Sequence, residues 1–199
     1  MIQDLDETIR QLLIQHVPIN ETVIDIQFDR PNQNWESRLT KPTINCFLYD
    51  IRENLSLRFD QQRYLTRNTP ANNEEKATGI ERVAPVRMDF TYLITTWTRS
   101  EETRVLEEHM LLGNILRTLL RFPILSSEML RGELVNQPLP VRTWVAQPED
   151  MPKTWEFWGA NEWRLKAGLS YRVTLAVEPV LPEGVELVTE TILRMQLTS

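Results

Sequence analysis

The chain has 199 residues and a formal net charge of −6, with 41% hydrophobic and 25% charged residues. This length suits about one domain with its own core, and the composition is that of an ordinary globular protein. The acidic balance argues against a dedicated nucleic-acid binder, which would carry a basic patch. No apolar run approaches the roughly 20 residues that cross a bilayer. The single cysteine, Cys46, excludes an internal disulfide and indicates a reducing compartment.

The first quarter of the chain predicts one helix and two strands. Residues 1–17 place apolar side chains at helical spacing, and a proline follows, so we expect an amphipathic helix. Residues 22–28 alternate like a strand with one buried face. Residues 43–51 are apolar on both faces, which predicts a strand covered on both sides. The segment 29–42 between them is polar and contains Trp35, and we expect a loop there.

The next segment, residues 52–83, is long, polar and rich in Arg, Asn and Gln. A loop of this length inside one domain is uncommon unless it has a function or is disordered. Two strand-like pieces, residues 56–59 and 63–67, suggest a protruding hairpin.

Residues 84–125 carry the clearest pattern, a strand followed by a helix. From Val86 to Ile94 the even positions are apolar and three odd ones are polar, which predicts a strand with one buried face. Ser100 is suited to cap the helix, and Pro123 ends it. One side of the helix is expected to cover the strand, because apolar residues and a glycine recur on it at spacings of three and four. This side comprises Leu106, Met110, Gly113, either Leu116 or Leu119, and Leu120. The three polar strand positions are Arg87, Asp89 and Thr91.

The last third predicts shorter elements and one clear strand. We expect a helical turn at 126–132, an edge strand at 138–147 because of its prolines, and a short helix at 148–159. Residues 166–178 alternate as a strand does. The tail that follows is β-prone, but it comes after a Pro-Val-Leu-Pro break that suits the end of a domain.

Residues with catalytic side chains are few. Glu107, Glu108 and His109 combine acid–base and metal-ligand types, but they lack the H-E-x-x-H spacing that sets two histidines on one face. His16 and His109 are expected at core or boundary positions, and Cys46 as a small buried hydrophobe. Phosphate-cradling and nucleophile-elbow motifs do not occur. We predict no catalytic residue, cofactor or metal; the alternative is a small cytoplasmic enzyme that uses Glu107, Glu108 and His109.

Arginine and tryptophan in loop-like segments are candidates for contacts with partner proteins, because these side chains carry much of the binding energy at interfaces. Burial of the tryptophans in the chain's own core is the alternative. A β-prone arm that is detached from its core is able to add a strand to another subunit's sheet. The candidate interface residues are Arg30, Trp35, Arg38, Arg58, Arg63, Trp155, Trp158, Trp163, Leu187, Thr189 and Ile192.

Four stretches, taken in order, resemble a known family. They are PTINCFLYDIREN (42–54), PVRMDFTYLITTWT (85–98), EEHMLLGNILRTLLRFPIL (107–125) and LSYRVTLAVEPVL (169–181). Together they resemble the cap, or tail-terminator, family of contractile injection systems, which are phage-tail-like particles.

This resemblance implies an α+β fold, with a mixed, mostly antiparallel sheet flanked by helices, as in phage tail terminators. It implies a cap domain at residues 1–181, with 52–83 as a protruding loop, and a C-terminal arm at 182–199. The implied function is structural: a homo-hexameric ring closes the distal end of the inner tube and binds the last rings of sheath and tube proteins. Neither nucleic acid nor direct membrane insertion is expected, and assembly is expected in the cytoplasm as part of the particle.

Overall fold

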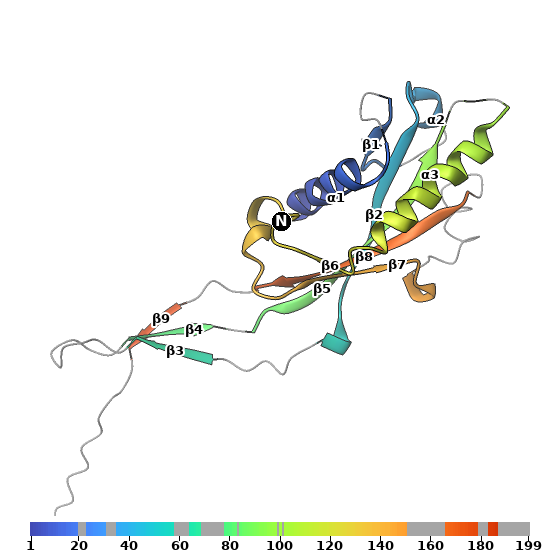
Figure 1. The fold of residues 1–199 in the computed structure, drawn as a ribbon. Coiled ribbons are helices and arrows are strands. Elements are labelled where there is room, and N and C mark those ends of the chain that lie inside the picture. Colours follow the sequence, from blue (N-terminus) through green and yellow to red (C-terminus); the bar gives the residue numbers. More distant parts are fainter. Residues whose placement is uncertain are drawn as a thin grey trace, which may run out of the picture. The chain divides into compact units, whose positions relative to one another are not determined.

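The computed structural model describes residues 1–19, 23–30, 35–57, 64–68, 78–82, 84–98, 100, 102–150, 166–178 and 183–186. The chain divides into two units. A core unit comprises residues 1–54 and 87–176, and a small unit comprises residues 55–86 and 177–199. Each unit is built on a sheet of its own (Figure 1).

The core unit is built on a six-stranded mixed sheet, and the fold is therefore of the α+β class. In spatial order its strands are β1 (Asp25–Gln27), β2 (Thr43–Glu53), β5 (Val86–Trp97), β8 (Gly168–Val177), β7 (Val141–Val145) and β6 (Ile124–Leu125). β1 and β2 are parallel, whereas β2 with β5, β7 with β8 and β6 with β7 are antiparallel. The strands predicted at 43–51, 86–94 and 166–178 are confirmed as β2, β5 and β8.

Two of the shorter strand predictions need correction. β1 covers only three of the residues 22–28. β7 was expected at an edge, but β6 pairs with its outer side, so β6 is the edge strand. The prolines that suggested an edge, Pro138 and Pro140, precede β7 and do not interrupt its ladder.

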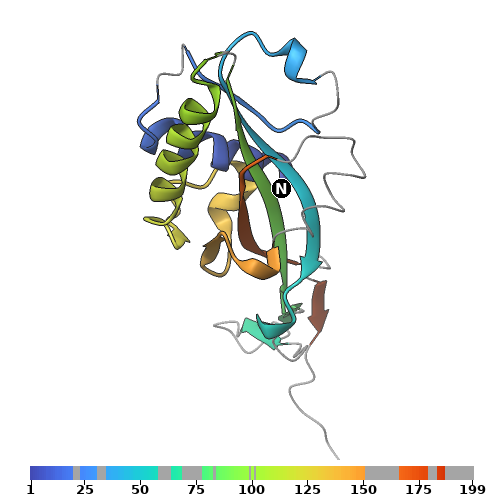
Figure 2. The same ribbon diagram turned by 90° about the vertical axis from the view of Figure 1, so that its right-hand side faces the viewer.

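Two helices, α1 (Ile2–His16) and α3 (Arg104–Leu119), cover one face of this sheet (Figures 1 and 2). The predicted first helix is confirmed, because α1 buries Leu5, Ile9, Leu12 and Leu13. The core between helices and sheet also takes in strand side chains that are at most 2% exposed. They include Ile44, Cys46, Phe90, Tyr92, Ile94, Tyr171, Val173 and Leu175.

The prediction for the buried side of α3 is wrong at three positions, whereas Leu119, one of its two alternatives, is fully buried. Leu106, Met110 and Leu120 are 73%, 66% and 59% exposed. The helix instead buries Glu108, Leu111, Ile115, Thr118 and Leu119. The helix has apolar residues on two sides, so its spacing alone allows either orientation. The side with Leu111, Ile115 and Leu119 packs on the sheet, and Glu108 on this side pairs with Lys166.

The start of α3 also differs from the prediction. Thr103, not Ser100, is the residue before the first helical turn. The Ser100 hydroxyl accepts a hydrogen bond from the Thr103 backbone N–H at 3.2 Å and so orders the approach to the helix.

The opposite face of β5 was expected to face solvent, and this is wrong as well. Arg87, Asp89 and Thr91 are only 5%, 3% and 2% exposed. Asp89 has hydrogen-bond partners in Asn54 and Thr174, and Arg87 donates to the Pro140 carbonyl at 3.2 Å. A pattern of alternation does not reveal such contacts.

Short helical segments connect these elements. They are α2 (Trp35–Arg38), η1 (Leu55–Leu57), η2 (Gly132–Asn136) and η3 (Pro148–Asp150). α2 lies where a loop was expected, and η1 occupies the described residues of the strand-like piece 56–59. The turn expected at 126–132 is followed by η2, and η3 is the described part of the helix expected at 148–159. Gly132 has φ +57°, and a side chain there would overlap the Asp4 carboxylate, so η2 packs closely on α1.

The small unit contains a three-stranded sheet. β3 (Tyr64–Asn68) and β4 (Thr78–Arg82) form an antiparallel hairpin, and β9 (Glu183–Glu186) pairs antiparallel with the other side of β4. The strand expected at 63–67 is thus confirmed as β3. Within the described parts of the chain, no helix is long and apolar enough to cross a membrane.

Candidate assembly surfaces

A buried carboxylate, Asp89, organises the face of the six-stranded sheet that lies opposite α1 and α3. Its oxygens accept hydrogen bonds from Asn54 Nδ2 at 3.0 and 3.2 Å and from the Thr174 hydroxyl. These contacts join β2, β5 and β8 across the sheet. Desolvating a carboxylate is costly unless it is paired and hydrogen bonded, and here both conditions are met.

Arg172 extends this network. Its Nε lies 3.9 Å from Asp89, its terminal nitrogen donates to Asp150 at 3.0 Å, and its guanidinium stacks 4.8 Å from the Trp144 ring. The arginine thereby connects β5, β8, β7 and η3. Burial, followed by the nearby Asp150 charge, raises the pKa of Tyr49 well above its ordinary value, so the phenol stays protonated.

Glu108 anchors α3 to the end of β5. One carboxylate oxygen lies 2.6 Å from Lys166 Nζ, and the other accepts the Thr98 backbone N–H at 3.2 Å. The Lys166 ammonium also lies 4.1 Å from the centre of the Trp97 ring. A buried carboxylate is therefore held by a cation and by a backbone donor, and it fixes the rotation of the helix about its axis.

The geometry does not bring the proposed acid–base residues together. Glu108 points into the protein, whereas His109 is exposed on the outer side, because consecutive helical residues diverge by about 100°. Glu107 accepts a hydrogen bond from the Thr103 hydroxyl at 2.5 Å. The expectation that His109 lies near the buried side is wrong, while His16 lies at a boundary and contacts Phe122 with ring centres 4.6 Å apart.

Other potentially reactive groups are buried or dispersed. Cys46 is fully buried, and desolvation raises the pKa of its thiol, as expected for a small core residue. Among the described residues, no group of three or more His, Cys, Asp or Glu side chains is placed to hold a metal ion.

The β1 edge of the six-stranded sheet is closed by side chains. Arg10 donates to the Ile26 carbonyl at 2.5 Å, and the Asp25 carboxylate accepts the Ile26 N–H at 3.1 Å. The Arg10 guanidinium also lies 5.1 Å from the centre of the Phe28 ring. Because both outward backbone groups of Ile26 already have partners, a further strand has little to pair with here.

The three-stranded sheet differs from the six-stranded one at its edges. β3 and β9 are its outer strands, and among the described residues no strand pairs with the far side of either. Its three strands come from segments far apart in the chain. An exposed row of backbone donors and acceptors is a template on which a strand of another protein is able to pair.

Few of the predicted interface residues lie in the described part of the chain. Arg30 and Arg38 are exposed, and Trp35 begins α2. The others lie outside the described residues: Arg58, Arg63, Trp155, Trp158, Trp163, Leu187, Thr189 and Ile192. The exposed apolar residues of α3 were missed as surface candidates, although their spacing identified them as one side of the helix.

Comparisons with known proteins agree on one family. The sequence model of one protein family, the Pvc16 N-terminal domain, matches residues 4–188. No curated protein matches the chain.

Two solved structures share its fold. The sheath/tube terminator of the extracellular contractile injection system PVC, in its extended state, is 22% identical with a TM-score of 0.68, and the match covers 100% of this chain and 64% of that one. The tube-terminating cap of the anti-feeding prophage is 23% identical with a TM-score of 0.66, covering 99% of this chain and 62% of the cap. The chain thus spans somewhat less than two thirds of either relative.

Proposed function

Because the chain belongs to the family of Pvc16 N-terminal domains, we propose that it caps the end of a contractile injection particle. In this role it is a structural protein and not an enzyme. Six copies form a ring that closes the distal end of the inner tube and binds the last rings of tube and sheath. The main support is the shared fold with two terminators along at least 99% of the chain.

The structure supports this role through its two kinds of sheet edge. A cap has to end one polymer and still bind it, so it needs one surface for attachment and another that does not template a further ring. The closed β1 edge suits the second requirement. The outer strands of the small sheet suit the first, because strand addition supplies main-chain hydrogen bonds.

We assign contacts with sheath and tube to the small unit and to arginine and tryptophan side chains of the core unit. The C-terminal arm, residues 182–199, is proposed to strengthen attachment to the sheath. Assembly takes place in the cytoplasm as part of a phage-tail-like particle. The assigned residues are Arg30, Trp35, Arg38, Arg58, Arg63, Trp155, Trp158, Trp163, Leu187, Thr189 and Ile192.

The test is co-expression with the sheath and tube proteins of the same particle, followed by negative-stain electron microscopy. We expect particles of uniform length with a six-fold ring at one end, and particles of uncontrolled length when the protein is omitted. A protein that stays strictly monomeric with both partners present, together with normal particles in its absence, contradicts the proposal.

A further inference from the structure

The outward side of α3 is an uncovered apolar surface. Leu106, Met110 and Leu120 recur at helical spacing along it, and each is more than half exposed. Two flanking residues, Val105 and Ile124, are 59% and 51% exposed. Single exposed apolar side chains are normal, but several on one side of a helix indicate an interaction surface.

Gly113 lies in the middle of this surface, and nothing in its own chain explains it. A β-carbon placed there meets no heavy atom within 4 Å, and the residue is not in the left-handed region of backbone conformation. At Gly168, by contrast, a β-carbon would approach the Ile94 carbonyl oxygen to 3.1 Å. Glycine weakens a helix interior relative to alanine. The benefit of Gly113 therefore lies outside the chain, where it permits close approach of another backbone.

Positive side chains lie at one end of this apolar surface. Arg117 and Arg121 are exposed beside Leu120, at the C-terminal end of the helix. Arg121 donates to the His16 carbonyl at 3.2 Å, and no carboxylate pairs with Arg117 or Arg121 in the ion pairs described for this part of the chain. A partner seated on α3 is therefore expected to present apolar side chains together with carboxylates.

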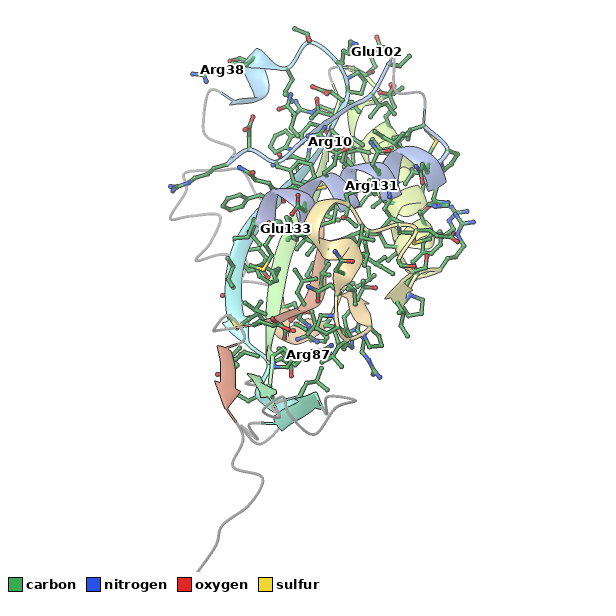
Figure 3. All side chains as sticks on the ribbon, turned by 90° about the vertical axis from the view of Figure 1, so that its left-hand side faces the viewer. Arg10, Arg38, Arg87, Glu102, Arg131 and Glu133 are labelled. Carbon is green, nitrogen blue, oxygen red and sulfur yellow. The ribbon has the colours of Figure 1, made fainter. Side chains whose placement is uncertain are left out.

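The core unit carries such a surface on its opposite side. The N-terminal part of α1 and η2 expose Ile2 and Val135, which are 37% and 49% exposed, together with Glu7 and Glu133. Glu128, in the turn before η2, is exposed as well. Figures 2 and 3 view the molecule from opposite sides: α3 is in front in Figure 2, whereas α1 and η2, with Glu133, are in front in Figure 3.

The cations on the α1 side are already engaged within the chain. Arg131 donates to the carbonyls of Glu128 and Leu130, and Arg10 donates to the carbonyl of Ile26. Both arginines are labelled in Figure 3. Three carboxylates of this side also have partners within the chain: the Met1 ammonium pairs with Asp4 at 2.9 Å and with Glu133 at 3.4 Å, and Arg10 pairs with Glu7 at 3.5 Å. Glu128 and Glu133 remain exposed to a partner, because the Glu133 side chain is 82% exposed.

We propose that the outward side of α3 in one copy docks on the α1–η2 side of the next copy, with Gly113 at the closest approach. Two different surfaces on opposite sides of one molecule make a heterologous contact, which repeats from copy to copy and closes a ring when the rotation permits. This inference rests on the proposed ring and identifies the surfaces that form it.

Engineered cysteines test the contact directly in particles co-assembled with sheath and tube proteins. The double variant Met110→Cys/Val135→Cys is expected to give disulfide-linked species larger than dimers, because each copy contributes both halves of the contact. Either single variant is expected to give dimers at most. Cys46 does not compete, because it is buried.

If particles contain the double variant but no species above the single-variant background forms, the docking is wrong while the cap function stands. If the chain is absent from the particles, the cap function itself fails. The two failures are therefore distinguishable on one gel.

Charge-reversal variants on the two surfaces test whether a second copy is the partner of α3. Arg117→Glu/Arg121→Glu and Glu128→Arg/Glu133→Arg are each expected to weaken ring formation by about tenfold, and their combination to restore it. Rings that form normally while sheath binding is lost would place a sheath subunit on α3 and overturn the proposal.

Gly113→Ala is expected to stabilise the isolated chain but to weaken its assembly. It is expected to raise the melting temperature of the isolated chain by about 2–4 °C through helix propensity, and to reduce ring formation several-fold. Unchanged ring formation in this variant would show that the two copies do not approach each other at Gly113.

Discussion

The two sheets of this protein differ in how the backbone groups at their edges are satisfied. The six-stranded sheet carries two helices on one face and a buried polar network on the other, and side chains of Arg10 and Asp25 close its β1 edge. The three-stranded sheet is assembled from segments distant in sequence, and its outer strands are open among the described residues.

This difference indicates a division of tasks. A strand edge whose donors and acceptors are occupied resists addition of a further strand, so the β1 edge of the core unit is protected against strand addition. A sheet of three short strands is at the lower limit of independent stability and gains from completion by a partner. The variants below test this division by their effects on the core unit, from the largest expected effect to the smallest.

The largest effect is expected from Glu108→Ala. This change removes the carboxylate partner of Lys166, whose side chain is only 12% exposed, and the acceptor of the Thr98 N–H. Breaking a buried ion pair by removing one partner costs about 3–5 kcal/mol of the free energy of unfolding. Urea denaturation followed by circular dichroism measures this cost. The control is Glu107→Ala, and an equal cost for both variants would contradict the anchoring role of Glu108.

A second pair of variants tests which side of α3 faces the core. Leu119 is fully buried and Leu120 is 59% exposed. Leu119→Ala is expected to cost about 2–5 kcal/mol of unfolding free energy, as buried leucine truncations do, and Leu120→Ala less than about 0.5 kcal/mol. Thermal and urea unfolding of the two variants measure both values. Similar costs for the neighbours would mean that α3 is rotated from the orientation described here.

The closed edge is tested by Arg10→Ala. It removes the guanidinium that occupies the Ile26 carbonyl, at an expected cost of about 1 kcal/mol because the arginine is partly exposed. Opening the edge is also expected to increase self-association, which sedimentation velocity detects. Arg30→Ala serves as the surface control. An Arg10→Ala protein that stays as dispersed as wild type would show that this edge needs no protection.

A pH response of the core unit is expected from Asp6. Burial raises the pKa of its carboxyl, although the hydrogen bond from the Tyr92 hydroxyl at 2.7 Å opposes this. The folded state then holds the proton more tightly than the unfolded state, so the contribution of Asp6 to stability falls as pH rises from its unfolded pKa through the folded one. Asp6→Asn should therefore gain stability relative to wild type as the pH rises above the unfolded pKa of aspartate, about 3.9. A difference that is independent of pH in melting experiments would contradict this.

The smallest effect on the core unit is expected from deletion of residues 183–199. Because β9 pairs with β4 of the small sheet, and with no strand of the core unit among the described residues, the melting temperature of the core unit should not change. Binding to the sheath protein, measured by pull-down, should weaken. A truncated chain that fails to fold would show that this segment belongs to the core, and unchanged sheath binding would remove the arm from the attachment surface.

The sequence by itself determined the type and order of the principal elements. β5, β8 and α1 each have a periodic pattern that indicates one structure, and β2 is a short run that is apolar on both faces. It also predicted the family, through four stretches in a fixed order. It did not determine which side of α3 faces inward, since two sides of that helix are apolar. Only the tertiary structure decided this: it buries Leu111, Ile115 and Leu119 against the sheet and brings Lys166, from a distant part of the chain, to Glu108 on the same side.

The burial of the polar residues of β5 was likewise not predictable from the sequence pattern. Alternation placed Asp89 in solvent, but the strands on both sides bring Asn54, Thr174 and Arg172 to it. Likewise, β9 pairs with a strand about one hundred residues earlier, and the closed β1 edge depends on an arginine from α1. Such contacts join residues that are distant along the chain, and local periodicity carries no information about them.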